Sequence, residues 1–253
     1  MKQIDILLID LLMDLLANAE NSGTCGPNLK WLFTDNGVLI ISGKGKMNDY
    51  TYDNKAPWYE YDIKRIIIGD GVTTIGEEAF WYCSSLTSVT IPNSVTYIGG
   101  EAFCNCSRLT SISIPNSITE IGGSAFSYCS ALTSVTIPNS VTTIEDWAFS
   151  GCSALTSVNI PNSVTTIGEF AFEGCTNLQK VHIGNCVKTI GTSAFENCTS
   201  ITQISSEAVV PPICDSGAFY GINKYKCKLI VPKNRLASYT WAYQWGDFLL
   251  IEG

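Results

Sequence analysis

A motif of constant length recurs through the middle of the chain, and this period constrains the fold more than any other feature. The segment LTSVTIPNSV begins at Leu86 and again at Leu132, and LTSVNIPNSV begins at Leu155, so that each step is 23 residues or a multiple of it. The same step connects a row of phenylalanines, each preceded by alanine: Phe80, Phe103, Phe126, Phe149, Phe172 and Phe195. A single unit cannot cover its own apolar face. The period therefore predicts a stack of similar coils.

The extended parts of each unit show an alternating pattern. In LTSVTIP, the alternation predicts Leu132, Val135 and Ile137 in the core and Ser134 and Thr136 in solvent. Proline then ends the strand, because it has no N–H to donate. The following SVTTI predicts a second, shorter extended piece.

The variable segment EDWAFSGC predicts a short helical turn. Its apolar residues Ala148, Phe149 and Cys152 fit one inward face of such a turn. The expected fold class is therefore an α/β repeat solenoid, a right-handed stack of parallel short strands with short helical turns.

Both ends of the chain depart from the repeat. Residues 23–64 predict an N-terminal β-hairpin cap, in which Asn36-Gly37 forms the turn of LKWLFTDNGVLIISG, and the solenoid is expected over residues 65–219. Residues 220–253 predict a C-terminal αβ cap with a strand, a short helix and a final strand. The cap aromatics are expected to cover the end of the stack: Tyr239, Trp241, Tyr243, Trp245 and Phe248.

The first 22 residues form a leader-like apolar segment with two interpretations. The segment resembles a signal peptide cut after Ala19, and its leucine spacing also fits a retained amphipathic helix. It is too short and too acidic for a stable membrane span.

The unit LTSVTIPNSVTTIG..AF..C resembles the BspA-type leucine-rich repeat of bacterial surface proteins, which also occurs in some protozoan surface proteins. The resemblance covers about residues 65–219, and CGPNLKWLFTDNGVLIISGKGKM and LIVP...Y..W..F resemble the flanks that often accompany it. It implies an extracellular or cell-surface protein with a role in adhesion to host or matrix proteins, in co-aggregation or in surface display.

Eleven cysteines first suggest a disulfide scaffold, but six of them occupy one repeat position. Such a row predicts buried free thiols that pack as small apolar groups. A bridge between Cys214 and Cys227 remains an alternative. The regular spacing is architectural and predicts no metal site.

Catalysis and nucleic-acid binding have little support. His182, the one histidine, replaces Thr136 at a solvent-facing strand position, which predicts a surface substitution. Neither a facing carboxylate pair nor a nucleotide motif occurs, so no catalytic residue and no cofactor are predicted. A formal charge of −8 argues against nucleic acid as a partner.

The variable turn positions hold large aromatics at a place where most side chains are expected to face solvent. These aromatics, with one on a neighbouring strand, are the candidate binding residues: Trp81, Tyr82, Tyr97, Tyr128, Trp147 and Phe170. They predict a non-enzymatic interaction module with a protein partner. A glycan partner, a purely structural display repeat, an ice-binding row of Ser and Thr, and aromatics without a role remain alternatives.

Overall fold

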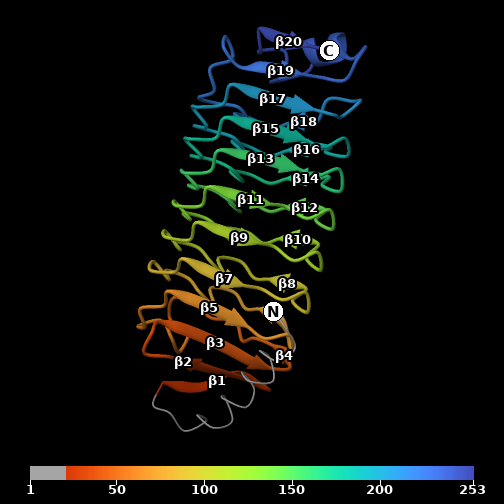
Figure 1. Ribbon diagram of the computed structural model, residues 1–253. Helices are drawn as coiled ribbons and strands as arrows, with labels where there is room; N and C mark the ends of the chain where they lie inside the picture. The colour runs from red at the N-terminus through yellow and green to blue at the C-terminus, as the bar shows by residue number, and fades with distance from the viewer. Residues whose placement is uncertain (1–20) are drawn as a thin grey trace.

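The computed structural model describes residues 21–253 as one elongated stack of coils (Figure 1). Its first ladder consists of β1 (Ser22–Gly26), β2 (Leu29–Phe33), β3 (Val38–Gly43), β5 (Arg65–Ile68), β7 (Ser88–Thr90), β9 (Ser111–Ser113), β11 (Ser134–Thr136), β13 (Ser157–Ile160), β15 (Lys180–Ile183), β17 (Gln203–Ser206), β19 (Lys228–Ile230) and β20 (Leu250–Glu252). Its second ladder consists of β4 (Gly45–Lys46), β6 (Val72–Ile75), β8 (Tyr97–Ile98), β10 (Glu120–Ile121), β12 (Thr143–Ile144), β14 (Thr166–Ile167), β16 (Thr189–Ile190) and β18 (Ile213–Cys214). The stack therefore extends beyond the periodic part of the sequence at both ends.

Strands of successive repeats pair in parallel and keep the repeat register. Asn159 lies opposite His182, and His182 lies opposite Ser205, so residues of one repeat position form a row. Ser134 and Thr136 face solvent, while Leu132 and Ile137 are buried and Val135 is half-buried, as the alternation predicts. Side chains at one repeat position therefore form a continuous surface along the stack.

The predicted helical turns are not helices. In the segment 145–152, the N–H groups of Trp147, Phe149 and Gly151 donate at 2.8 Å to carbonyl oxygens of the next coil. The alternate N–H groups, starting with Ala148, donate to the carbonyl three residues back. Trp147 also has a left-handed backbone, with φ of 61°, which a right-handed helix excludes. The helical prediction was wrong because half of the turn's hydrogen bonds are made to the neighbouring coil.

These turn bonds keep the stack continuous where strand pairing is interrupted. β11 and β13 belong to different sheets, as do β7 and β9, and as do β8 and β10 of those latter two coils. The turns of the same two coils remain joined by three bonds, from the N–H groups of Glu101, Phe103 and Asn105 to the coil above. One core cluster of buried side chains runs from the first coils to the last.

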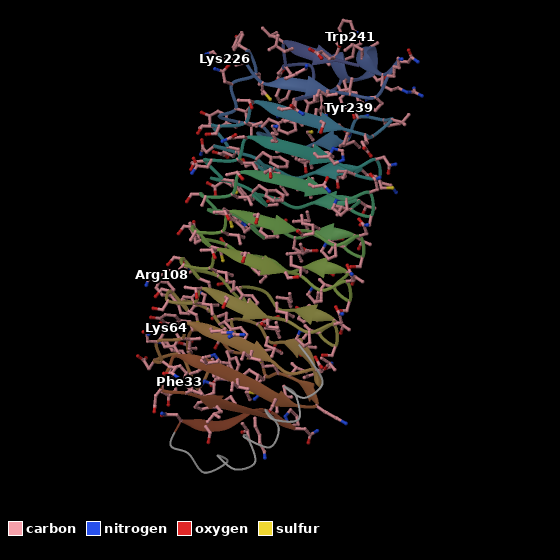
Figure 2. All side chains as sticks on the ribbon, in the orientation of Figure 1. Phe33, Lys64, Arg108, Lys226, Tyr239 and Trp241 are labelled. Carbon is pink, nitrogen blue, oxygen red and sulfur yellow. The ribbon has the colours of Figure 1, made fainter. Side chains whose placement is uncertain are left out.

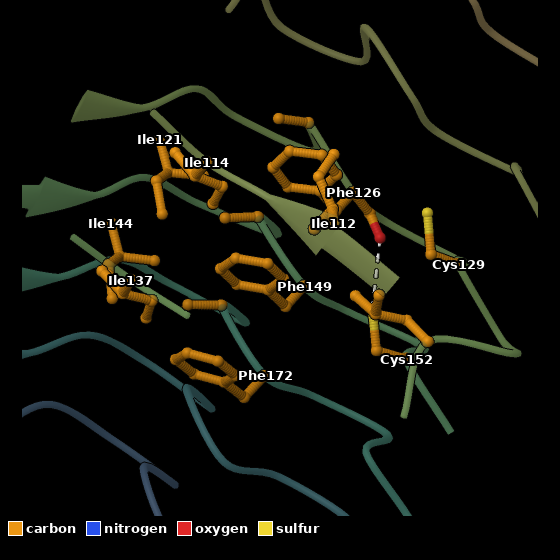
Figure 3. Close-up of a cluster of buried hydrophobic side chains, with 14 of the residues drawn as sticks. Ile112, Ile114, Ile121, Phe126, Cys129, Ile137, Ile144, Phe149, Cys152 and Phe172 are labelled. Atoms are coloured by element: carbon orange, nitrogen blue, oxygen red, sulfur yellow. Dashed lines mark hydrogen bonds between the residues drawn. The ribbon is translucent and has the colours of Figure 1, made fainter. Parts of the chain in front are cut away.

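The repeated phenylalanines form a column of rings through the core. Phe149 lies between Phe126 and Phe172, with ring centroids 5.5 and 5.3 Å away and nearly parallel planes (Figure 3). All seven rings of the column, from Phe80 to Phe219, are fully buried, and successive centroids are 5.2 to 5.9 Å apart. Each phenylalanine therefore depends on the coils on both sides for its packing.

The repeated cysteines are free and form a second column. The Cys152 thiol donates to the Phe126 carbonyl oxygen of the preceding coil at 3.2 Å (Figure 3), and the same bond recurs at Cys106, Cys129, Cys175 and Cys198. Burial raises the pKa of Cys152 to about 12, so this thiol stays protonated at neutral pH. Cys214 and Cys227 are also free. Cysteine suits this position because it is small, apolar and able to donate weakly.

The two ends of the column are covered by other aromatics. At the first coil, Trp58 stacks on Phe80 at 5.6 Å, and its indole N–H donates to the Ala79 carbonyl oxygen at 2.8 Å. At the last coil, Trp245 and Phe248 contact Phe219 edge-on.

Two cap aromatics were assigned wrongly. Trp241 follows helix α2 (Leu236–Thr240) and is 88% exposed, and Tyr243 is also exposed. Tyr239, Trp245 and Phe248 are buried as predicted. In Figure 2, Trp241 lies at the outer end of the cap and Tyr239 beneath it. A helix of five residues turns only part of its surface toward the stack, so neighbouring aromatics cannot all be buried.

The hairpin that precedes the stack is present. β2 pairs with β3 in antiparallel fashion, with Gly37 at φ of 78° in the turn between them. β3 then pairs in parallel with β5, which joins the hairpin to the repeats. Apart from Asn21 and Ser22, the leader-like segment lies outside the described residues.

Candidate interaction surface

The turns that precede the long strands form one edge of the stack, with two rows of left-handed residues along it. The first turn row consists of Glu78, Glu101, Ser124, Trp147, Phe170 and Ser193. The second turn row consists of Tyr82, Asn105, Tyr128, Gly151, Gly174 and Asn197. The φ angles of the non-glycine members lie between 50° and 63°. Left-handed geometry lets alternate N–H groups point toward the next coil, so it is part of the fold.

Four of the six predicted binding residues occupy these left-handed positions. They are Tyr82, Tyr128, Trp147 and Phe170, with φ of 63°, 56°, 61° and 54°. Non-glycine residues lose roughly 1–2 kcal/mol in this conformation, and bulky ones are rare in it. Gly151 and Gly174 occupy the row of Tyr82 and Tyr128, and Gly217, with φ of 68°, continues the row of Trp147 and Phe170, so glycine serves the backbone in both rows. The aromatic rings are therefore present despite the local backbone preference.

The rings lie outside the core and in contact with their neighbours along the edge. Trp147 stacks on Phe170 of the next coil, with centroids 4.1 Å apart and planes 13° from parallel. The Tyr128 ring lies against Gly151, where a Cβ atom would be only 2.6 Å from it. Tyr128 is 51% exposed and Trp147 is 38% exposed, so both present apolar surface to solvent.

At the first coils, Trp81 belongs to an aromatic cluster that the sequence did not indicate. Its ring stacks on Tyr59 at 5.9 Å and contacts Tyr52 and Tyr82 edge-on. The Lys55 ammonium lies 3.9 Å from the centroid of Tyr59. Tyr52 and Tyr82 are exposed, whereas Trp81 itself is half-buried beneath them. Residues before the first repeat thus enlarge the aromatic surface.

Tyr97 lies apart from the other five candidates. It is on β8 in the second ladder, opposite Thr74. Partial burial and the nearby charges of Glu77, Asp49 and Glu120 raise its pKa. The structure therefore places Tyr97 in an acidic environment and not in the aromatic edge.

The turn position directly before the second turn row, which Ser150 occupies in its repeat, is more buried than the sequence suggested. Cys104, Ser127 and Ser150 are all buried there, although this position varies between repeats. The Ser150 hydroxyl donates to the Glu173 carboxylate of the next coil at 2.7 Å. Variation along a row was therefore an imperfect guide to solvent exposure, because neighbouring coils can satisfy a small polar residue.

A polar groove of about 320 Å³ lies at the corner that follows the long strands β13 and β15. Carboxamides of Asn139, Asn159 and Asn162 line it together with His182 and Glu207. The corner follows the long strands and the aromatic turns precede them, so the two features occupy different edges of the coils.

His182 is held in place by its neighbours in this groove. Its Nδ1 atom lies 3.0 Å from Ser205 Oγ, and its Nε2 atom lies 3.6 Å from a Glu207 carboxylate oxygen. The Ser205 hydroxyl also lies 3.4 Å from the Val181 carbonyl oxygen, to which it can donate. These contacts on both ring nitrogens orient the imidazole in the groove. His182 lies at the solvent-facing strand position that the sequence predicted, and its side chain is half-buried there.

A model of the BspA type leucine rich repeat region matches residues 53–150 and 128–243, with 6 copies of the repeat. These ranges include most of the chain, and the repeats they contain carry the ring column and the turn rows. The chain belongs to this BspA-type family. A search of curated proteins finds no match.

Solved structures of leucine-rich repeat proteins from bacteria resemble this BspA-type chain. The T. pallidum leucine rich repeat protein (TpLRR) is 28% identical, with 72% of this chain and 81% of that chain covered and a TM-score of 0.56. A leucine-rich repeat protein from Bacteroides ovatus ATCC 8483 is 22% identical, with 90% and 75% covered and a TM-score of 0.50. A leucine rich cell surface protein from Faecalibacterium prausnitzii A2-165 is 24% identical, with 86% and 77% covered and a TM-score of 0.49. The first two relatives support the repeat fold.

Metal sites, membrane-spanning helices and basic surfaces were also considered as features of this BspA-type chain. Within residues 21–253, no group of three His, Cys, Asp or Glu side chains is placed to hold a metal ion. The same part of the chain has no helix with the length and apolar character needed to cross a membrane. Two basic residues of the C-terminal cap, Lys224 and Lys228, form ion pairs, each 2.7 Å from a carboxylate oxygen.

Proposed function

We propose that this BspA-type repeat is a non-enzymatic adhesion module of the cell surface or extracellular space that binds a protein partner through its aromatic turn edge. The observation that carries the proposal is the presence of Tyr82, Tyr128, Trp147 and Phe170 at left-handed backbone positions. Glycine would serve the fold there, as it does at Gly151 in the row of Tyr82 and Tyr128 and at Gly217 in the row of Trp147 and Phe170. Side chains that persist against a backbone preference are commonly functional.

The contacts among the rings do not account for their presence. Stacking of Trp147 on Phe170 is worth about 0.5–1.5 kcal/mol, which at most offsets the backbone cost of one residue. Tyr82 and Tyr128 keep half of their surface in water. Exposed aromatics held rigidly lose little entropy on binding, which favours a role as anchors of an interface.

The extent of the edge favours a protein partner. Tyr82 and Phe170 are four coils apart, which corresponds to roughly 20 Å at the usual strand spacing. A row of that length, widened by Tyr52 and Lys55, suits a standard interface of about 800 Å² on each partner. A small molecule would contact only a fraction of it.

A glycan partner is the second candidate. The exposed rings of Tyr52, Tyr82 and Tyr128 offer apolar faces on which sugar rings can stack. This candidate makes the same residues important and differs in the class of ligand.

The test uses glycine substitutions, since these remove a ring and relieve the backbone at the same time. Trp147→Gly should keep the fold and weaken partner binding by about 2 kcal/mol or more, or roughly thirtyfold. Ser193→Gly is the matched control, because Ser193 lies in the same row at φ of 53° without a ring. The wild type and both variants are tested against a panel of host matrix proteins and against a glycan array.

Binding of a matrix protein that is lost in Trp147→Gly and retained in Ser193→Gly supports the proposal. Equal binding by both variants, with the fold intact, would refute the aromatic edge as the binding surface. Ring-dependent binding on the glycan array alone would replace the protein partner by the second candidate.

A further inference from the structure

The corner after the long strands carries a row of prolines that is interrupted within the repeats. The regular members are Pro92, Pro115, Pro138 and Pro161, and Gly184 and Glu207 take the place of proline in the next two coils. Two rings in succession are therefore missing between Pro161 and Pro232, and the shape and the polarity of this edge change there. The polar groove lies at that place.

Gly184 draws the corner of its coil toward the preceding coil. A Cβ atom at Gly184 would lie 2.7 Å from Asn162 Oδ1 and from the Pro161 backbone. The Gly184 N–H, which proline would lack, donates to the Ile160 carbonyl oxygen at 3.0 Å. The next N–H, of Asn185, donates to Asn162 Oδ1 at 2.7 Å. This close approach leaves a recess beside Glu207 on the following coil.

The strand row that borders the recess also changes from hydroxyls to larger polar groups. Thr90, Ser113 and Thr136 are followed by Asn159 and His182. Asn159 and His182 are direct cross-strand neighbours, and the His182 ring is fixed by Ser205 and Glu207. Substitutions in two separate rows therefore converge on one groove.

The lining has the chemistry of a site for a neutral ligand rich in hydroxyl groups. Each carboxamide of Asn139 and Asn159 can both donate and accept, as a sugar hydroxyl does. The lining has a single carboxylate, Glu207, which lies 3.6 Å from His182 Nε2, and no group of three His, Cys, Asp or Glu side chains within residues 21–253 is placed to hold a metal ion. A volume of about 320 Å³ is at the lower limit of small-molecule sites, which begin near ~300 Å³.

We propose that this groove binds one or two rings of a neutral saccharide, at a site separate from the aromatic turn edge. Asn139, Asn159 and Asn162 hydrogen-bond the sugar hydroxyls, His182 and Glu207 close one side, and Pro161 supplies an apolar contact. The proposal does not depend on the partner of the aromatic edge.

The single histidine of the chain provides a selective probe. The imidazole Hε1 proton of His182 should give one resolved NMR signal, and its shift reports occupancy of the groove. The intact chain is titrated with a panel of neutral mono- and disaccharides, and separately with calcium chloride and with sialyllactose as a charged sugar. At least one neutral sugar should shift the signal in a saturable manner below ~10 mM.

Variants locate the binding. Asn159→Thr should weaken the response at least about tenfold, because a carboxamide partner is lost and threonine fits this row, as at Thr136. Ser113→Thr, in the same row outside the groove, and Trp147→Gly, on the aromatic edge, should leave the response unchanged.

Three results would overturn the proposal. These are no shift with any neutral sugar of the panel, a shift only with calcium or sialyllactose, and a sugar response that is unchanged in Asn159→Thr or lost in Trp147→Gly. A sugar response that is lost in Trp147→Gly would assign sugar binding to the aromatic edge.

Discussion

Replacement of Phe149 by alanine tests the ring column directly. The ring is fully buried and contacts Phe126 and Phe172 on the adjacent coils. Loss of a buried phenylalanine costs about 3–5 kcal/mol, and the upper part of this range applies where the surroundings cannot collapse. The Phe149 N–H bond to Ala171, at 2.8 Å, holds the coils apart at their normal spacing. We therefore expect a loss of about 4 kcal/mol in the free energy of unfolding.

The assay is equilibrium unfolding in guanidinium chloride, with Trp147→Ala as the matched control two residues away. Trp147 is partly exposed, and its replacement removes one stacked pair, so this variant should lose only about 1 kcal/mol. Because the Phe149 cavity lies between coils, amide exchange in Phe149→Ala should accelerate on both sides of it and not in one coil alone. Equal losses in the two variants would mean that the column contributes no more than the surface pair, and the reasoning would fail.

Four further outcomes are expected. Glu101→Gly should raise the free energy of unfolding by about 0.5–1 kcal/mol and shift the denaturation midpoint upward, since glycine accepts φ of 55° and a charge beside Glu78 is removed. Trp58→Ala should cost about 3 kcal/mol or more in the same assay, because it exposes the first ring of the column. A maleimide should label Cys186, the exposed thiol, rapidly in the native protein, and Cys186→Ser should lack this fast phase. Burial raises the pKa of Cys152 from its ordinary value of 9.0 to about 12. The contribution of this buried neutral thiol to the free energy of unfolding should therefore be fully present below pH 9 and be lost between pH 9 and 12, because the unfolded chain ionises first. Over that range the melting temperature should decline less steeply in Cys152→Ala than in the wild type.

The repeated residues made the core predictable from sequence. Leu132, Phe149 and Cys152 recur because each must fit against its own copies above and below, so the period identifies inward positions directly. The shape of the turn was not predictable in the same way. A spacing of three residues between Phe149 and Cys152 fits both a helix and the observed turn, and the choice depends on carbonyl oxygens of the next coil.

The candidate sites were predictable only in part. The aromatic residues at the turns were found as departures from the repeat, but their left-handed backbone and the contribution of Tyr52 and Lys55 required the structure. The groove had a sequence signal, the replacement of proline by Gly184 and Glu207. A single substitution in a row has many explanations, and only the structure shows that the substitutions in the two rows line the same groove.

The ring column has a consequence for how such chains can diversify. Since each coil adds one ring at a nearly constant interval, gain or loss of a whole unit between Tyr82 and Trp147 would change their separation by one strand spacing, about 4.8 Å, without disturbing either turn. A partial insertion leaves the column intact only where a loop takes up the extra residue, as between Phe195 and Phe219, which are 24 residues apart and still stack at 5.9 Å. Distances between the exposed rings can therefore change only in whole steps, and a partner that contacts two of them would measure the number of coils between them.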